Sequence, residues 1–391
     1  MKMHDTLYDG SAQSFINSLL RDAIKKRASD IHLESARENL RIRYRIDGVL
    51  YDIQREFCAN VSHILSRIRV LSAINIAKKR APQDGKFSFV YLNRSIDIRV
   101  STFPAQFGEK CVLRILDPAL HAINLSQLGM HADVYSLFKV LIEKNSGFFL
   151  VTGPTGSGKT TTLYAALSYL NTIERNIITL EDPVEYELTG ITQGNIHPEA
   201  GFTFEKGIRA ILRQDPDIAM IGEIRDAVSA CVAIEAALAG HLIVSTLHTR
   251  NAPGAITRLI DMGIEPFLVN AAINGVLAQR LARRICSSCN ETRQPTDSEK
   301  KVLEKWHLSL PTISYGKGCH ICEHLGYKGR IGIFELCVIS NTLRSLIIQK
   351  PSIDILYDQA CKDGMKTLYD DAAQKLKSGT ISLEEFTRVL S

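Results

Sequence analysis

The segment that most constrains this chain is residues 153–160, which read Gly-Pro-Thr-Gly-Ser-Gly-Lys-Thr. Its glycines allow the backbone to curl so that successive N–H groups point at phosphate oxygens, and a helix that starts at Lys159 adds its positive end. An apolar run, Phe148–Thr152, precedes the segment, and a helical stretch follows it. Strand, loop and helix in this order predict a P-loop that binds a nucleotide. The plain alternative is a glycine-rich turn with an exposed lysine.

The motif assigns a role to each of its polar residues. Lys159 is expected to reach the β- and γ-phosphates of ATP, and the Thr160 hydroxyl is expected to hold magnesium. Thr161 extends the polar first turn of the helix. The residues expected to contact nucleotide are Gly153, Pro154, Thr155, Gly156, Ser157, Gly158, Lys159, Thr160 and Thr161.

Beyond the P-loop, short apolar runs alternate with helical stretches. Strands that are apolar on both faces and separated by helices predict a parallel sheet covered on both sides, and hence an α/β fold. A further helix is expected at 132–144. The expected strands are 148–152, 177–180, 218–221 and 242–247, and the expected helices between them are 159–170, 204–213 and 227–239.

Titratable residues follow three of these strands at their carboxyl ends, where open α/β sheets bind ligands. They are Glu181, Glu223 and His248. A carboxylate there can hold magnesium through water or orient the water that attacks the γ-phosphorus, and Glu223 is the preferred base, with Glu181 and Glu185 as alternatives. The plain alternative is that such acids cap helices, as Asp226 would. His248 is expected either to sense the γ-phosphate or to satisfy a hydrogen bond at a strand end.

The first 117 residues predict a smaller α+β domain. Helical spacing of apolar residues covers 12–29 and 61–76, while 40–46, 96–100 and 111–115 alternate as strands do. In 40–46 the alternate residues are arginines, so one face packs and the other is basic. Residues 118–131 show no sustained period and are expected to link this domain to 132–391.

Four of the nine cysteines form two Cys-x-x-Cys pairs. Cys286, Cys289, Cys319 and Cys322 offer two chelating turns, which predicts a tetrahedral zinc site within a subdomain at about 283–332, although the gap between the pairs exceeds the usual spacing. Two redox pairs or reduced packing cysteines are the alternatives. The other five lie singly in apolar or mixed stretches and are expected to be packing residues: Cys58, Cys111, Cys231, Cys337 and Cys361.

Composition narrows the class of protein less than the motifs do. Lysine and arginine number 47 against 42 acids, a mild excess that suits an anionic partner or an ordinary solvated surface. The N-terminus has no signal-peptide pattern, and no apolar stretch reaches the length of about 18 residues that a spanning helix needs. We therefore expect a cytoplasmic protein.

Taken together, these motifs resemble those of the secretion ATPases that power type II secretion and type IV pilus assembly. The resemblance covers almost the whole chain. It is carried by Arg27-Ala-Ser-Asp-Ile-His-Leu-Glu34, Arg43-Tyr-Arg-Ile-Asp-Gly-Val-Leu50, the P-loop, the aspartate box Ile178-Thr-Leu-Glu-Asp-Pro-Val-Glu185, the Walker B segment ending in Gly222-Glu223, the histidine box Gly240-His-Leu-Ile-Val-Ser-Thr-Leu-His248 and the four cysteines.

The resemblance implies a RecA-like ATPase core preceded by a PAS-like domain. It implies ATP, magnesium and zinc as cofactors, and a homo-hexamer on the cytoplasmic face of a bacterial inner membrane, held by a platform or docking protein. Since retraction relatives generally lack the four cysteines, it favours the assembly and secretion branch. Candidates to reach the phosphates from the N-terminal domain are Arg43, Arg45, Arg99 and Arg114.

Two features depart from the family pattern. The common Asn-Asp-Ala after the histidine-box threonine is Arg250-Asn251-Ala252 here, and the long extra N-terminal domain of many secretion ATPases is missing from the sequence.

Two other functions compete with a secretion motor. A nucleic-acid motor with a RecA-like core would show salt-dependent DNA binding, yet the sequence contains no recognisable DNA-binding module, and we expect no nucleic-acid partner. An inactive scaffold would bind ATP without turnover.

Overall fold

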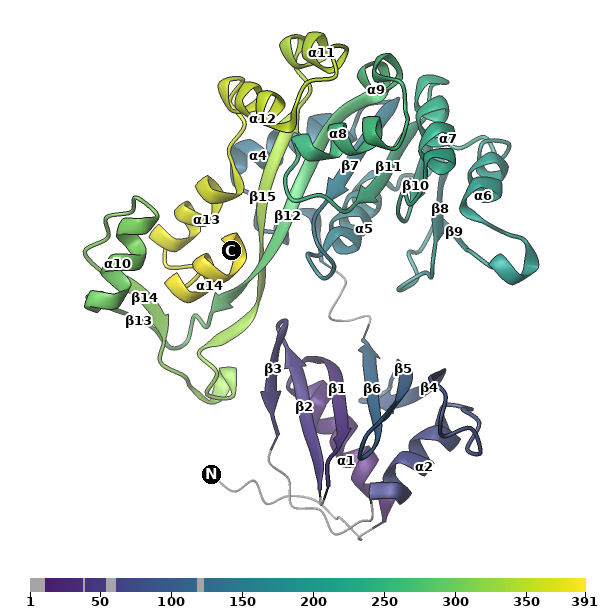
Figure 1. Ribbon diagram of the computed structural model, residues 1–391, viewed down its shortest axis with the longest axis vertical. Helices are drawn as coiled ribbons and strands as arrows, with labels where there is room; N and C mark the ends of the chain where they lie inside the picture. The colour runs from purple at the N-terminus through teal and green to yellow at the C-terminus, as the bar shows by residue number, and fades with distance from the viewer. Residues whose placement is uncertain (1–10, 38, 54–60, 118–122) are drawn as a thin grey trace. The chain divides into compact units, whose positions relative to one another are not determined.

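The computed structural model of the protein describes residues 11–37, 39–53, 61–117 and 123–391. It divides into two compact units, Met1–His121 and Ala122–Ser391, which we describe separately (Figure 1). Cys58 and residues 118–122 of the predicted linker lie outside the described residues.

The first unit is an antiparallel sheet with two helices packed on it. Its strand order is β3-β2-β1-β6-β5-β4, and every neighbouring pair runs antiparallel. Alternate side chains point to the helices, and the Tyr44 hydroxyl donates to the carbonyl oxygen of Leu19 (3.1 Å). The elements are α1 (Ala12–Lys25), β1 (Ala28–Ser35), β2 (Leu40–Ile46), β3 (Val49–Asp52), α2 (Val61–Leu71), β4 (Gln83–Tyr91), β5 (Arg94–Ala105) and β6 (Gly108–Leu116).

Both helices of this unit are shorter than their apolar spacing predicts. The prediction that they extend to residues 29 and 76 was wrong, because the chain turns into the left-handed region just beyond each helix. Arg27 has φ of +58° and Ala73 has φ of +56°. After Ala73, the Ile74 N–H bonds back to the carbonyl oxygen of Arg69 (2.9 Å), which closes the helix end.

The second unit is built on a seven-stranded sheet with the order β15-β12-β7-β11-β10-β8-β9. All neighbouring strands run parallel except β12 and β15, so the predicted α/β fold with a parallel sheet is confirmed. One buried cluster packs α4 and α5 against one face, and another packs α6 to α9, α11 and α12 against the other. The strands are β7 (Gly147–Thr152), β8 (Ile177–Glu181), β9 (Thr192–Asn195), β10 (Ile218–Ile221), β11 (Leu242–Leu247), β12 (Ile273–Ile285), β13 (Asn290–Arg293), β14 (Ile313–Gly316) and β15 (Tyr327–Val338).

Helices α5 to α10 lie in the connections between these strands, α4 precedes β7, and α11 to α14 follow β15 (Figure 1). Short 3-10 turns lie at Leu125–Gln127, Pro198–Ala200 and His320–Cys322. The helices are α4 (Ala132–Ile142), α5 (Lys159–Leu170), α6 (Phe204–Ile211), α7 (Ala227–Leu238), α8 (Pro253–Asp261), α9 (Pro266–Ala272), α10 (Asp297–Lys305), α11 (Asn341–Ile347), α12 (Ile353–Lys362), α13 (Leu368–Lys377) and α14 (Leu383–Leu390).

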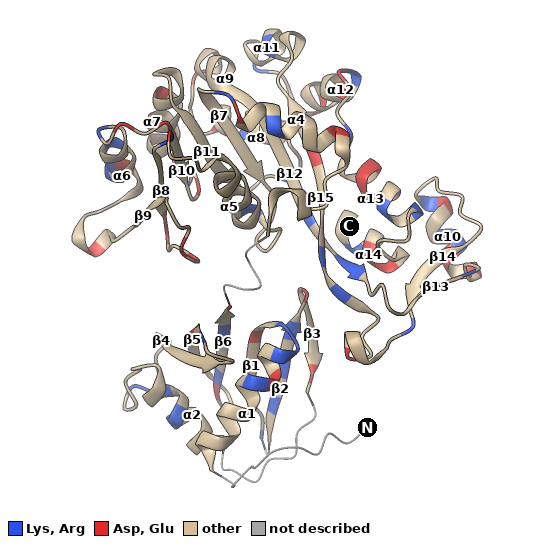
Figure 2. Ribbon diagram, turned by 180° about the vertical axis from the view of Figure 1, so that it is seen from behind, with Lys and Arg blue, Asp and Glu red and all other residues tan. Residues whose placement is uncertain are grey.

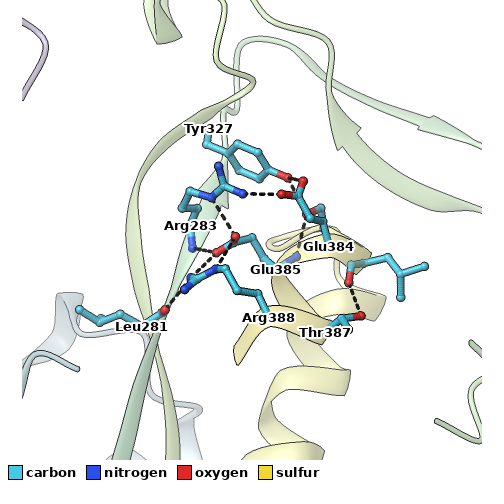
Figure 3. Close-up of polar contacts among 9 residues, drawn as sticks. Leu281, Arg283, Tyr327, Glu384, Glu385, Thr387 and Arg388 are labelled. Atoms are coloured by element: carbon cyan, nitrogen blue, oxygen red, sulfur yellow. Dashed lines mark hydrogen bonds and ion pairs between the residues drawn. The ribbon is translucent and has the colours of Figure 1, made fainter. Parts of the chain in front are cut away.

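The strand pair β12–β15 extends beyond the main sheet and forms an arm that the sequence did not predict. A separate core lies against it, with Trp306, Tyr369 and Phe386 in mutual ring contact. Within the arm, Arg283 of β12 is paired with Glu384 and Glu385 of α14 (Figure 3). In the part of the chain that the structure describes, no helix is long and apolar enough to cross a membrane.

Candidate active site

The P-loop joins β7 to α5 at the carboxyl edge of the seven-stranded sheet (Figure 1). Its glycines adopt left-handed or extended positive angles, with φ of +150° at Gly153 and +87° at Gly158. A Cβ atom at Gly153 would lie 2.4 Å from the carbonyl oxygen of Gln279, and one at Gly158 would lie 2.8 Å from the Gln279 Nε2. The loop therefore needs glycine at both positions to curl beside β12 in a form that can surround a phosphate.

The ammonium group of Lys159 is buried and folds back onto this loop. It donates to the carbonyl oxygens of Gly153 (2.9 Å) and Pro154 (3.2 Å). Burial lowers the pKa of Lys159 to about 8, against the opposing effect of the Glu223 charge. A cation that has lost most of its water attracts an incoming anion strongly, which suits phosphate binding. Thr160 is exposed on the first turn of α5, so its hydroxyl is open to a magnesium ion.

The remaining P-loop residues differ in exposure. Pro154, Thr155 and Gly156 are exposed, whereas Ser157 is buried and Thr161 is half-buried. The exposed tip and the buried flanks are what a loop that closes around phosphate requires. These positions agree with a nucleotide-contacting role, which stays a prediction for each residue.

Glu223 lies at the centre of a charged cluster beyond the strand ends. Its Oε1 accepts from the Arg225 Nε (2.5 Å), and its Oε2 lies 3.5 Å from the His248 Nε2. Arg225 also pairs with Asp182 (3.2 Å). Since Glu223 influences the pKa of Lys159, the cluster and the P-loop lysine share one electrostatic environment. The structure thus brings Glu223, His248 and Lys159 to the same edge of the sheet.

Glu181 occupies a different environment from Glu223. It is 3% exposed, and its carboxylate accepts from the hydroxyls of Thr179 (2.6 Å) and Tyr164 and from the Gln193 Nε2 (3.2 Å). Burial raises the pKa of Glu181 despite these donors. Because Tyr164 belongs to α5 and Gln193 to β9, Glu181 holds the P-loop helix against the sheet. This favours Glu223 over Glu181 as the base.

For one acid at the strand ends, the structure shows helix capping, the alternative to a role in hydrolysis. Asp226 caps α7, since its Oδ1 accepts from the Ser229 N–H (2.8 Å). The departure at Arg250-Asn251-Ala252 has a similar explanation, because the Asn251 Oδ1 accepts from the Gly254 N–H (2.9 Å) at the start of α8. An aspartate could accept the same bond, so this departure preserves the local cap.

Gln279 was missed by sequence reasoning, although it lies directly against the P-loop. Its Nε2 donates to the carbonyl oxygen of Ser157 (2.8 Å), and its Oε1 accepts from the Thr162 hydroxyl (2.7 Å). It therefore fixes both the loop and the first turn of α5 to β12. The available signal was a polar residue directly after the apolar run Val276–Ala278.

The four candidate arginines of the first unit lie on the sheet face opposite its helices. Arg45 and Arg114 both face Asp30 across neighbouring strands, and Arg99 faces Arg114. Asp30 pairs with Arg114 (3.1 Å) and Arg45 (3.7 Å), while Arg43 pairs with Glu34 (2.6 Å). Figure 2 shows the basic bands along β2.

A hollow of about 530 Å³ opens beside two of these arginines. Arg99, Arg114 and Lys86 contribute cations to its lining, and Asp84 contributes an acid. The hollow lies wholly within the first unit, so its basic rim is a property of that sheet face.

The four predicted zinc ligands come together at the tip of the arm. Their Sγ atoms all lie within 4.8 Å of one another, with Cys286–Cys319 at 3.9 Å, and Cys289–Cys322 and Cys319–Cys322 at 3.8 Å. Tetrahedral zinc with Zn–S bonds of about 2.3 Å places its sulfurs about 3.8 Å apart, so this geometry fits the metal.

Cys322 has the electrostatic features of a thiolate ligand. Burial alone would raise the pKa of Cys322, but the backbone N–H groups of Cys319 (3.2 Å) and Gly326 (3.3 Å) donate to its sulfur, and its pKa falls to about 7. A thiolate stabilised in this way suits a metal site.

Comparisons with known proteins agree with this geometry. Residues 6–388 match the family model described as type II/IV secretion system protein. The chain is 45% identical over 382 residues to the type II secretion system ATPase E of Vibrio cholerae serotype O1, covering 97% of this chain and 76% of that protein. It is 43% identical over 381 residues to the type IV pilus assembly ATPase PilB of Myxococcus xanthus, covering 96% and 67%. The ATPase DotB of Legionella pneumophila shares the fold, with a TM-score of 0.74 and 20% identity over 99% of this chain and 97% of that one.

Proposed function

The chain belongs to the type II/IV secretion system protein family, and we propose that its ATP hydrolysis drives assembly of a type IV pilus or a type II secretion pseudopilus. The observation that carries the proposal is the joint placement of a P-loop and the Glu223–His248 cluster at one sheet edge. Relatives named for secretion and for pilus assembly both exceed 40% identity, which supports the assembly and secretion branch.

Each residue of the site has a distinct part in the proposed reaction. The P-loop backbone and Lys159 bind the phosphates, and Thr160 would hold magnesium, which neutralises phosphate charge when bound. Glu223 orients and deprotonates the attacking water, since it is partly exposed and stands beyond the strand ends. His248, whose Nε2 lies 3.5 Å from the Glu223 Oε2, would sense the γ-phosphate. Glu181 supports α5 from behind.

Further groups are proposed to complete the site in the assembled protein. Arg43, Arg45, Arg99 and Arg114 would stabilise phosphate charge once the first unit, proposed to be PAS-like, closes on a nucleotide. The assembly is proposed to be a homo-hexamer whose sites open and close in turn. In the structure Arg43 is paired with Glu34, and Arg45 and Arg114 share Asp30, all on their own sheet.

The remaining proposals concern location and metal. We propose that the protein works at the cytoplasmic face of a bacterial inner membrane, held by a platform or docking protein of the apparatus. Zinc bound by Cys286, Cys289, Cys319 and Cys322 would stabilise the arm and take no part in hydrolysis, because four thiolates leave no open position.

The test is steady-state ATP hydrolysis by the purified chain, by Glu223→Gln and by Glu235→Gln. Loss of the base is expected to lower kcat by about 100-fold or more, while nucleotide binding persists. Glu235 is an exposed acid of α7, and its substitution should leave kcat unchanged. Equal turnover by Glu223→Gln and the unaltered protein would move the base to another acid.

The same preparation discriminates the rival functions. Particle mass and bound zinc are recorded, and hydrolysis is repeated with single- and double-stranded DNA. ATP binding without turnover would indicate a scaffold, and strong, salt-dependent stimulation by DNA would indicate a nucleic-acid motor.

A further inference from the structure

The loop that connects β11 to α8 is anchored to neighbouring strands along its main chain. The Thr249 N–H donates to the Thr152 Oγ1 at the end of β7 (2.8 Å). The Arg280 Nη2 of β12 donates to the carbonyl oxygen of Arg250 (2.6 Å). These two bonds fix the middle of the loop, while the His248 side chain remains 52% exposed beside Glu223.

The far end of this loop is held by a buried carboxylate. Glu335 of β15 is 1% exposed, and its Oε1 accepts from the N–H of Ala252 (2.7 Å). Ala252 is the N-cap of α8, where backbone N–H groups lack partners within the helix. A carboxylate at a helix N-terminus satisfies such a donor and is favoured by the helix dipole.

The second oxygen of Glu335 reaches the C-terminal helices. Its Oε2 accepts from the Tyr357 hydroxyl of α12 (3.1 Å) and from the N–H of Leu368 (3.3 Å), the first residue of α13. One carboxylate therefore joins the N-terminus of α8, the N-terminus of α13 and a side chain of α12.

The sheet register places Glu335 level with the nucleotide edge. Glu335 lies opposite Ala278 on β12, Ala278 lies opposite Thr152 on β7, and Thr152 lies opposite Leu247 on β11. Thr152 immediately precedes the P-loop and Leu247 immediately precedes His248. The carboxylate thus acts in the same row as the residues that lead into the catalytic segments.

We propose that Glu335 is a positioning residue for ATP hydrolysis. Through the Ala252 N–H it fixes the loop that presents His248 to Glu223, and through Tyr357 and Leu368 it ties that loop to α12 and α13. A shift of these helices therefore moves His248. Conversely, a change at the nucleotide site moves the helices through the same bonds. The inference rests on the proposed function, since it requires His248 to act in hydrolysis.

Steady-state hydrolysis by Glu335→Gln tests this role. The amide keeps a single acceptor oxygen, so either the Ala252 N–H of the loop or the Leu368 N–H of α13 loses its acceptor. Either loss breaks the link between the loop and the helices, and kcat is expected to fall about tenfold, with KM for ATP within about twofold. Glu385→Gln is the matched control, because Glu385 is equally buried and hydrogen-bonded but holds α14 to the arm. Its kcat per folded molecule should equal that of the unaltered protein.

A double-mutant cycle with His248→Ala separates positioning from general damage. If Glu335 acts through the His248 loop, adding Glu335→Gln to His248→Ala changes kcat by less than about twofold. Independent losses of about tenfold that multiply would overturn the proposal, as would an unchanged kcat in Glu335→Gln.

Tyr357→Phe keeps the proposal testable if Glu335→Gln fails to fold. It removes one donor from the carboxylate, so kcat is expected to fall. Because both helix N-termini stay bonded, the expected loss is only about threefold. A kcat unchanged by Tyr357→Phe would in that case overturn the inference. Absence of ATP hydrolysis by the unaltered protein would instead count against the proposed function.

Discussion

Two buried glutamates lie near opposite ends of the β12–β15 strand pair, and their surroundings hold them in different ways. Glu335, inside the main sheet, accepts from two backbone N–H groups and one hydroxyl. Glu385, against the outer arm, accepts from the guanidinium groups of Arg283 and Arg388 and from a backbone N–H (Figure 3). The first is held by dipoles and the second by full charges.

The difference appears in the direction of each pKa. Burial raises the pKa of Glu335, and its neutral donors and the Arg280 charge do not overcome this effect. Burial acts in the same direction on Glu385, but the Arg388 and Arg283 bonds outweigh it and lower the pKa. At equal burial, the charged form is therefore favoured for Glu385 at the outer arm and disfavoured for Glu335 at the nucleotide edge.

Metal removal is expected to have the largest effect, and to act on the outer arm alone. Structural zinc in small peptides contributes apparent free energies of about 10–16 kcal/mol, so Cys319→Ser should lose zinc and lower the unfolding midpoint of the arm strongly. Trp306, the single tryptophan, packs on Tyr369 and Phe386 and reports this region by fluorescence.

The control for this change is Cys361→Ser, which alters a partly exposed cysteine outside the cluster. It should keep zinc and the Trp306 transition. Full zinc content and an unchanged transition in Cys319→Ser would contradict a metal at this site.

Glu385→Gln is expected to have the next largest effect, on stability. Removing one partner of a buried ion pair leaves uncompensated charge, which costs about 3–5 kcal/mol. Glu335→Gln should cost less, about 1–3 kcal/mol, because its partners carry no full charge. Denaturant unfolding followed by Trp306 fluorescence and by circular dichroism measures both. Equal losses would show that the dipole-held and charge-held carboxylates are equivalent.

The parallel sheet was predictable because its central strands are buried on both faces. The runs at 218–221 and 242–247 coincide with β10 and β11, and the P-loop sets the start of α5 at Lys159. The prediction that the candidate functional residues lie at the carboxyl ends of the strands followed from the order of strands and helices alone. Glu181 was harder to judge, since its partner Tyr164 on α5 turns it into the core.

The arm could not be predicted in the same way. The outer half of β12 contains Arg280, Arg283 and Arg284, so a strand there reads as a basic cluster. Arg283 becomes a buried residue through Glu385, which lies 102 residues later. Glu335 likewise depends on Ala252, 83 residues earlier. No local period records bonds of this separation.

The smallest expected effect is an opposite pH dependence of the two glutamates. The folded-state pKa of Glu385 is lowered, so its stabilisation is present above the ordinary value of about 4.3 and is lost as the pH falls below it. The folded-state pKa of Glu335 is raised, so its contribution is full below about 4.3 and is lost as the pH rises through the folded value. A tenfold change in the acid dissociation constant between the unfolded and folded states corresponds to about 1.4 kcal/mol.

The measurement is the free energy of unfolding between about pH 3 and pH 8, expressed as the unaltered protein minus each glutamine variant. Cysteine protonation and metal loss affect all three proteins alike, so they cancel in this difference. The difference for Glu385→Gln should shrink on acidification, whereas that for Glu335→Gln should shrink as the pH rises. Parallel curves for the two variants would mean that the neutral donors around Glu335 stabilise its charge as well as the two arginines stabilise that of Glu385. The proposed contrast between the two glutamates would then not hold.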